Sequence, residues 1–161
     1  MIRSVMHARH PGRTVLIGLA LLVLGLAGCV TPPSQREGAV ERLLGRINEG
    51  GVEERIALSA LPFVLDREII IVERDLRTLW VNLTDVGFAL TDPEVVSLKY
   101  GQESLYRAFG ETMDMEVYFD RYAPEVVSVA TVEAQEGTFL LILGERDRLA
   151  PVLHGIKGPL Q

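Results

Sequence analysis

The chain has 161 residues, and its 16 lysines and arginines against 22 aspartates and glutamates give a net charge of −6 at pH 7. Nucleic acid repels a chain of this charge, so the composition argues against a nucleic-acid-binding protein. One cysteine and three histidines without zinc-type spacing also predict that the chain holds no metal and no other cofactor.

The first residues have the order of an export signal. Residues 1–13 carry Arg3, Arg9 and Arg13 and no acid, and residues 15–26 are an unbroken run of apolar residues and glycine. Small residues follow the run, as a signal peptidase requires. The run is shorter than the roughly 18–20 residues that a membrane-spanning helix needs.

The apolar run ends at Leu26-Ala27-Gly28-Cys29, which resembles the lipobox of bacterial lipoproteins. The resemblance implies cleavage between Gly28 and Cys29, so that residues 1–28 are a signal peptide, and acylation of Cys29 at its thiol and its new α-amino group. Each buried methylene then adds about 0.8 kcal/mol of membrane affinity, and several chains together give a stable anchor. An uncleaved transmembrane anchor and a secretory signal with an incidental cysteine are the alternatives.

The residues after the cysteine indicate to which membrane an acylated protein is transported. Val30 is not acidic, which by resemblance to Gram-negative lipoproteins implies transport to the outer membrane, with the domain facing the periplasm. Residues 29–36, CVTPPSQR, are predicted to be the acylated cysteine and a stiff, proline-rich tether. The predicted partner at this end is membrane lipid, bound through acylated Cys29. Residues 37–161 remain as one domain with its own core.

Helical periodicity marks the start of this domain. A first helix is predicted to end at Gly50 and Gly51, and residues 52–61 predict a shorter second helix that ends before Pro62. The apolar stripe of the first helix, at positions i, i+3, i+4 and i+7, consists of Val40, Leu43, Leu44 and Ile47.

A hairpin and a third helix follow. Residues 63–65 and 68–72 predict two short strands joined by a turn. Asp75 is the predicted N-cap of the third helix, and Gly87 is its predicted end. The apolar stripe of this helix consists of Leu76, Leu79, Trp80 and Leu83.

The second half of the domain predicts an antiparallel meander. Alternating apolar and polar residues predict a strand at 113–120, and residues 103–109 predict a brief helix or an irregular crossing. Residues 139–143 are apolar on both faces, as in a central strand that is covered on each side. The other predicted strands are 94–100, 126–133, 138–144 and 151–157.

These elements make an α+β domain whose order resembles the NTF2-like family, which includes ketosteroid isomerase, scytalone dehydratase and the SnoaL-type polyketide cyclases. The resemblance rests on that order and on the link LPFVLDREIIIVERDLRTLW, and it covers residues 37–157. It implies a cone in which N-terminal helices pack on a curved antiparallel sheet, with a pocket at the open end. A homodimer formed through the sheet face is a further alternative that the family implies.

The catalytic residues of this family are largely missing. Isomerase-type sites carry a tyrosine on the first helix, but residues 38–50 contain neither tyrosine nor histidine. Cyclases and dehydratases use a His/Asp pair, and His154 is the only histidine beyond the signal. A surface histidine without a catalytic role is the alternative. The weak candidates for its partner are Asp114, Glu116 and Asp120.

Apolar and aromatic residues suggest a ligand pocket instead, although each of them also fits a place in the core. They are Trp80, Met113, Met115 and Tyr118. We therefore expect an acylated envelope lipoprotein with a non-catalytic NTF2-like domain that binds a small apolar ligand or an envelope protein. The alternatives are an isomerase, cyclase or dehydratase that uses His154 and a strand carboxylate, and a structural subunit of an envelope complex.

Overall fold

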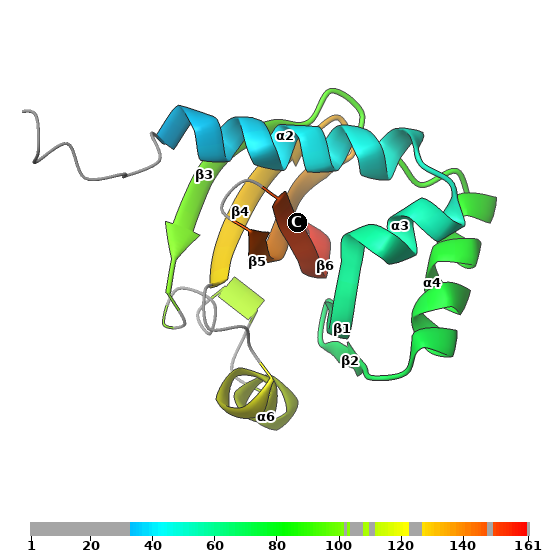
Figure 1. Ribbon diagram of the computed structural model, residues 1–161, viewed down its shortest axis with the longest axis vertical. Coiled ribbons are helices and arrows are strands. Elements are labelled where there is room, and N and C mark those ends of the chain that lie inside the picture. The colour runs from blue at the N-terminus through cyan, green and yellow to red at the C-terminus, as the bar shows by residue number, and fades with distance from the viewer. Residues whose placement is uncertain are drawn as a thin grey trace, which may run out of the picture. The chain divides into compact units, whose positions relative to one another are not determined.

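The structure is a computed structural model that describes residues 33–101, 103, 108–109, 112–122, 127–147 and 150–160. Within these residues the fold is α+β, with four helices and a six-stranded sheet (Figure 1). The helices are α2 (Pro33–Glu49), α3 (Val52–Leu58), α4 (Glu73–Asp85) and α6 (Met113–Arg121). The strands are β1 (Ser59–Leu65), β2 (Glu68–Ile70), β3 (Glu94–Tyr100), β4 (Val127–Ala134), β5 (Gly137–Asp147) and β6 (Ala150–Leu160). In the described part of the chain, no helix combines the length and the apolarity needed to cross a membrane.

The strands lie in the order β2-β1-β6-β5-β4-β3. From β3 to β6 each strand pairs antiparallel with the next, which confirms the meander except at 113–120. β1 pairs parallel with β6, with Val64 opposite Gly155, so the prediction of a wholly antiparallel sheet is wrong. A local pattern shows which residues are extended but not which distant strand they join. The parallel pair depends on the long connection through α4 and the meander.

Three helices contribute to the core on one face of the sheet. The predicted apolar stripe of α2 is buried there, together with Leu76 and Trp80 of α4. Trp80 packs edge-on against Phe63, with ring centroids 6.2 Å apart. Phe139 and Leu141 reach the same core from β5. The helices predicted from periodicity are therefore confirmed, because their apolar stripes bury against one sheet face.

Helix α6 contributes to the core on the other face, and the prediction of a strand at 113–120 is wrong. Thr112 is the N-cap, and its Oγ1 accepts a hydrogen bond from the Met115 amide at 3.3 Å. Met115, Tyr118 and Phe119 are buried at helical spacing, whereas Met113 is exposed. In the predicted strand, Tyr118 would point outward with the polar residues. In the structure it is buried with Met115 and Phe119, which together form one stripe of a helix.

Burial of β5 on both sides confirms the prediction for residues 139–143. Phe139, Leu141 and Leu143 belong to the core beneath α2, α3 and α4. Ile142 belongs to the second core, with the buried residues of α6. The central strand therefore joins the two cores, and its continuous apolar run follows from this position.

Several element ends differ from the prediction. α2 begins at Pro33, inside the segment predicted to be a tether, because proline is well suited to the first helical position. Residues 59–61, predicted to be helical, belong to β1. Val72 rather than Asp75 is the N-cap of α4, and the Asp75 amide donates to the Val72 carbonyl at 3.0 Å. The predicted element at 103–109 lies mostly outside the described residues.

A buried arginine joins the ends of two helices. Arg55 on α3 is 5% exposed, and its Nε donates to the carbonyl of Ile47 at 2.8 Å. Its Nη2 lies 3.4 Å from the carbonyl oxygens of Asn48 and Phe88. The last carbonyls of a helix have no partner within that helix and carry partial negative charge. Arg55 supplies both donors and positive charge where α2 and α4 end.

The same arginine belongs to a closed ring of hydrogen bonds. Arg55 Nη1 donates to Thr84 Oγ1 at 3.0 Å, and Thr84 donates to the Trp80 carbonyl at 2.7 Å. Trp80 Nε1 donates to Ser59 Oγ at 3.1 Å, and Ser59 donates to the Arg55 carbonyl at 2.8 Å. Every polar side chain in the ring therefore has partners, as burial requires.

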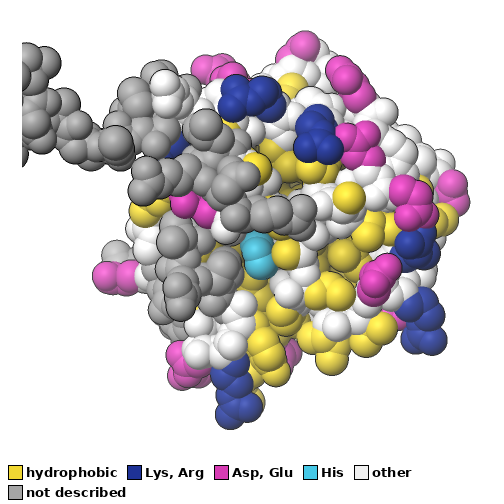
Figure 2. Space-filling view, viewed as in Figure 1, with side chains coloured by type: hydrophobic (Ala, Val, Ile, Leu, Met, Phe, Trp, Pro, Cys, Tyr) yellow, Lys and Arg dark blue, Asp and Glu magenta, His cyan; other side chains and the backbone are white. Residues whose placement is uncertain are grey.

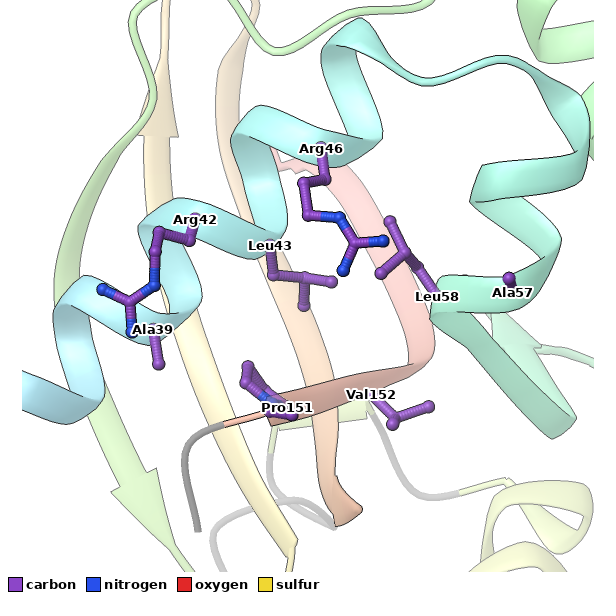
Figure 3. A pocket seen from close by; sticks show the side chains of 9 residues that line it. Ala39, Arg42, Leu43, Arg46, Ala57, Leu58, Pro151 and Val152 are labelled. Atoms are coloured by element: carbon purple, nitrogen blue, oxygen red, sulfur yellow. The ribbon is translucent and has the colours of Figure 1, made fainter. Parts of the chain in front are cut away.

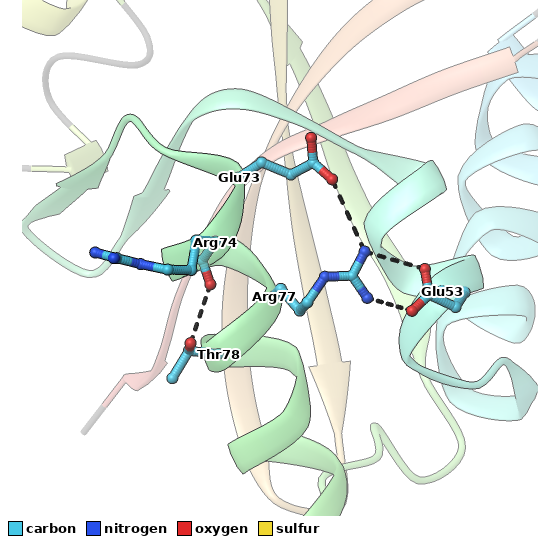
Figure 4. A network of polar contacts seen from close by, with 5 residues as sticks. All are labelled: Glu53, Glu73, Arg74, Arg77 and Thr78. Atoms are coloured by element: carbon cyan, nitrogen blue, oxygen red, sulfur yellow. Dashed lines mark hydrogen bonds and ion pairs between the residues drawn. The ribbon is translucent and has the colours of Figure 1, made fainter.

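An exposed ion-pair network also links α3 to α4 (Figure 4). Arg77 Nη2 lies 3.2 Å from Glu53 Oε2, and Nη1 bonds the other oxygen of the same carboxylate. Glu73 lies 3.8 Å from Arg77, one turn earlier on α4. The hydrogen bond from Arg77 lowers the pKa of Glu53. Exposed pairs of this kind contribute little to stability, so the buried Arg55 ring is the stronger link.

The Arg55→Met substitution tests the ring. It removes the donors but keeps an apolar stem, so three backbone carbonyls and Thr84 Oγ1 lose their partner. We expect the free energy of unfolding to fall by about 3 kcal/mol or more. Urea unfolding, followed by fluorescence of the single tryptophan, measures this change.

Arg74→Met is the matched control, because Arg74 is an exposed helical arginine on α4. We expect its effect to stay within about 0.5 kcal/mol. A similar loss in both variants would show that Arg55 contributes no more than a surface arginine.

Candidate functional site

The structure separates the four residues predicted to line a ligand pocket. Trp80 lies fully buried in the core beneath α2, α3 and α4. Met115 and Tyr118 lie in the second core, and burial raises the pKa of the Tyr118 phenol. Met113 is 80% exposed on the outer side of α6. None of the four lines either of the two hollows described below.

The structure also keeps the candidate catalytic residues apart. His154 lies on β6, half-buried, and its Nδ1 has no hydrogen-bond partner. Desolvation lowers the pKa of this imidazole. Asp114, Glu116 and Asp120 are exposed on helix α6 rather than on a strand. No hydrogen bond or ion pair among the described residues joins His154 to any of them.

The larger hollow, of about 540 Å³, lies at the end of α4, and we call it the apolar groove. Gly87, at φ +72°, ends the helix as predicted, and the Phe88 amide returns to the Leu83 carbonyl at 2.8 Å. This helix end brings the side chains at its two bonded positions together. The apolar wall consists of Leu65, Leu83, Val86, Phe88, Ala89, Phe139, Ile156 and Pro159.

The two carboxylates that line the groove already have partners within the fold. Glu136 accepts hydrogen bonds from the amide of Thr91 at 2.9 Å and from its hydroxyl. These bonds lower the pKa of Glu136, so it is ionised and is no proton donor at neutral pH. Asp66 Oδ1 accepts from the Gly158 amide at 3.0 Å. What the groove offers to a ligand is therefore mainly apolar surface, including the ring of Phe88, which packs edge-on against Phe139.

The smaller hollow, of about 300 Å³, lies between α2, α3 and the start of β6, and we call it the arginine pocket (Figure 3). Figure 3 shows Leu43 pointing from α2 toward β6, with Arg42 and Arg46 on either side of it. Figure 2 shows basic and acidic side chains next to one another over α2 and apolar side chains gathered below them, over β6, β1 and β2. The remaining lining residues are Ala39, Ala57, Leu58, Ala150, Pro151 and Val152.

Sequence reasoning missed both hollows because each of them joins elements that are far apart in the chain. Part of the groove could have been found, since Gly87 followed by Phe88 is typical of a helix end with an apolar contact back to Leu83. Arg42 and Arg46 stand one turn apart on either side of Leu43, which places them beside the apolar stripe. Nothing local indicates that β6 crosses below them.

No family model, curated protein or solved structure matches the chain. Among the described residues, no group of three or more histidine, cysteine, aspartate or glutamate side chains is placed to hold a metal ion. The candidate sites therefore rest on the geometry of the groove and the pocket.

The half-buried imidazole of His154 predicts a loss of stability in acid. Its folded-state pKa lies below the ordinary value of 6.5, so the unfolded chain binds the proton more tightly. Stability attributable to this group is complete above pH 6.5 and is lost as pH falls through the folded-state pKa. Comparing urea midpoints at about pH 7.5 and about pH 5.5, we expect a smaller decrease in His154→Gln than in the wild type. Equal decreases would show that other groups carry the effect.

Proposed function

We propose that the chain is an acylated envelope lipoprotein, anchored through Cys29, whose domain binds a small apolar ligand and catalyses no reaction. The lipobox sequence from Leu26 to Cys29 supports the anchor. Val30 supports transport to the outer membrane, with the domain in the periplasm. Membrane lipid is the proposed partner at this end of the chain.

The order of elements supports an NTF2-like architecture for the domain. Two helices, α2 and α3, precede the β1-β2 hairpin, and α4 and the meander follow. The helices α2, α3 and α4 share one core with the sheet, as the resemblance implies. The residues of the apolar groove come from this framework, at the end of α4.

The observation that carries the ligand proposal is the chemistry of the apolar groove. Its volume falls within the range of small-molecule sites, and its wall is mostly aliphatic and aromatic. Both carboxylate oxygens of Glu136 accept hydrogen bonds from Thr91, and Asp66 Oδ1 accepts one from the Gly158 amide. An apolar molecule could therefore cover the apolar wall without breaking these hydrogen bonds. The separation of His154 from the carboxylates of α6 supports a binding role rather than catalysis.

The anchor is tested by Cys29→Ala. We expect the variant to lose incorporation of radiolabelled palmitate, because the acylated thiol is gone, and to leave the membrane fraction or keep its signal uncleaved. Thr31→Ala is the control and should behave as the wild type. Unchanged membrane residence without label would favour a transmembrane anchor instead.

The groove is tested by Val86→Glu, with Met113→Glu as its matched control. The two side chains are 77% and 80% exposed, so neither change disturbs a core, and only Val86 lines the groove. We expect native mass spectrometry of the full chain to detect a bound apolar molecule in the wild type and in Met113→Glu. Val86→Glu should bind it about tenfold more weakly, because a charge now borders the apolar wall.

An unoccupied wild-type protein would contradict the ligand proposal. Loss of the bound molecule from both variants would show that it does not reside in the groove. A protein retained in place of a small molecule would favour an envelope partner.

A further inference from the structure

The arginine pocket differs from the rest of the molecule in its charge. The whole chain carries a net charge of −6, but the residues that line this pocket include two arginines and no acid. Arg46 is paired with Glu54 and Arg42 is paired with no described residue, so the hollow keeps an uncompensated positive charge that favours an anion on this acidic protein. The pocket is also separate from the apolar groove, since no residue lines both.

Both guanidinium groups have N–H donors that bond no other described residue. Arg42 makes no hydrogen bond or ion pair with any other residue that the structure describes. Arg46 Nε donates to Glu54 at 2.9 Å, and this pair is exposed, which leaves its Nη groups free for a ligand. Like charges at i and i+4 on a helix repel each other. Figure 3 shows the two guanidinium groups on opposite sides of Leu43, and an anion that drew them together would relieve this repulsion and accept charge-assisted hydrogen bonds from both.

The rest of the pocket is apolar. Leu43 and Leu58 are buried, and Pro151 and Val152 line the opposite side, on β6. An alkyl chain that packs against these side chains gains roughly 25 cal/mol for each Å² of its own apolar surface that leaves water, whereas a small hydrophilic anion has no such surface to bury. At about 300 Å³, the pocket has the volume of a small ligand site.

We propose that the arginine pocket binds an anionic amphiphile, with a phosphate or carboxylate head between Arg42 and Arg46 and an alkyl chain against Leu43, Leu58 and Val152. The ligand is amphipathic because the pocket offers both kinds of surface, side by side (Figure 3).

The proposed anchor makes the membrane a source of this ligand, and this step rests on the proposed acylation of Cys29. A free amphiphile in the surrounding medium is the other source.

Octyl phosphate is the probe that tests the site. The full chain is reconstituted in phosphatidylcholine nanodiscs and titrated with it, and thermal unfolding is followed by the fluorescence of Trp80. We expect octyl phosphate to raise the unfolding midpoint, and octanol or inorganic phosphate to do so at least tenfold less effectively. Arg42→Ala should weaken the response to octyl phosphate about tenfold.

Arg74→Ala is the matched control, because Arg74 is an exposed arginine on α4 that lines neither hollow. It should respond as the wild type does. Arg46→Ala is a second pocket variant that should also weaken the response. An equal response to octanol, or a response that survives in both pocket variants, would overturn the proposal.

A second experiment distinguishes a membrane lipid from a free amphiphile as the source of the ligand. Nanodiscs that contain phosphatidylglycerol should raise the midpoint without any octyl phosphate if the pocket takes a membrane lipid. A response to octyl phosphate alone would identify a free amphiphile as the ligand. A chain that fails to enter the discs contradicts the acylation. The titration with octyl phosphate is then repeated on that chain in solution, where it tests binding in the arginine pocket independently of the anchor.

Discussion

The arrangement of the helices depends on the buried guanidinium group of Arg55. It lies at the point where α2 and α4 both end, and its acceptors are backbone carbonyls and one hydroxyl, with no carboxylate. Its Cζ also lies 5.7 Å from the centre of the Trp80 ring, a cation–π distance. A buried charge needs all of these partners, so the helix ends are fixed relative to each other. Both hollows are bordered by the helices that this contact fixes.

The two hollows differ in whether their charged side chains already have hydrogen-bond partners within the fold. In the apolar groove, Asp66 links the turn between β1 and β2 to Gly158 of β6, and Glu136 links the turn between β4 and β5 to Thr91. In the arginine pocket, Arg42 is bound to nothing that the structure describes. The groove thus suits a ligand without charge, and the pocket suits one with a negative charge.

Local sequence patterns predicted most of the helices and strands, because a buried helix stripe or strand face requires apolar residues at regular spacing. The stripes of α2 and α4 and the run from Phe139 to Leu143 are of this kind. The α6 region was misread because the apolar alternation that begins at Met113 resembles a strand until Tyr118 is counted as apolar. The parallel pairing of β1 and the role of Arg55 arise from contacts between distant segments. No local pattern contains them, and the same holds for both hollows.

The order of the strands decides where a foreign strand could add to this sheet. β2 and β3 are the two edge strands, and within the described residues no further strand pairs with their outer sides. Open edges of this kind are where chains aggregate, and short length and charged side chains prevent it. β2 has three residues, and the longer β3 carries Glu94 and Lys99. One edge is therefore protected by its shortness and the other by its charge, so neither edge favours the addition of a strand from a second chain.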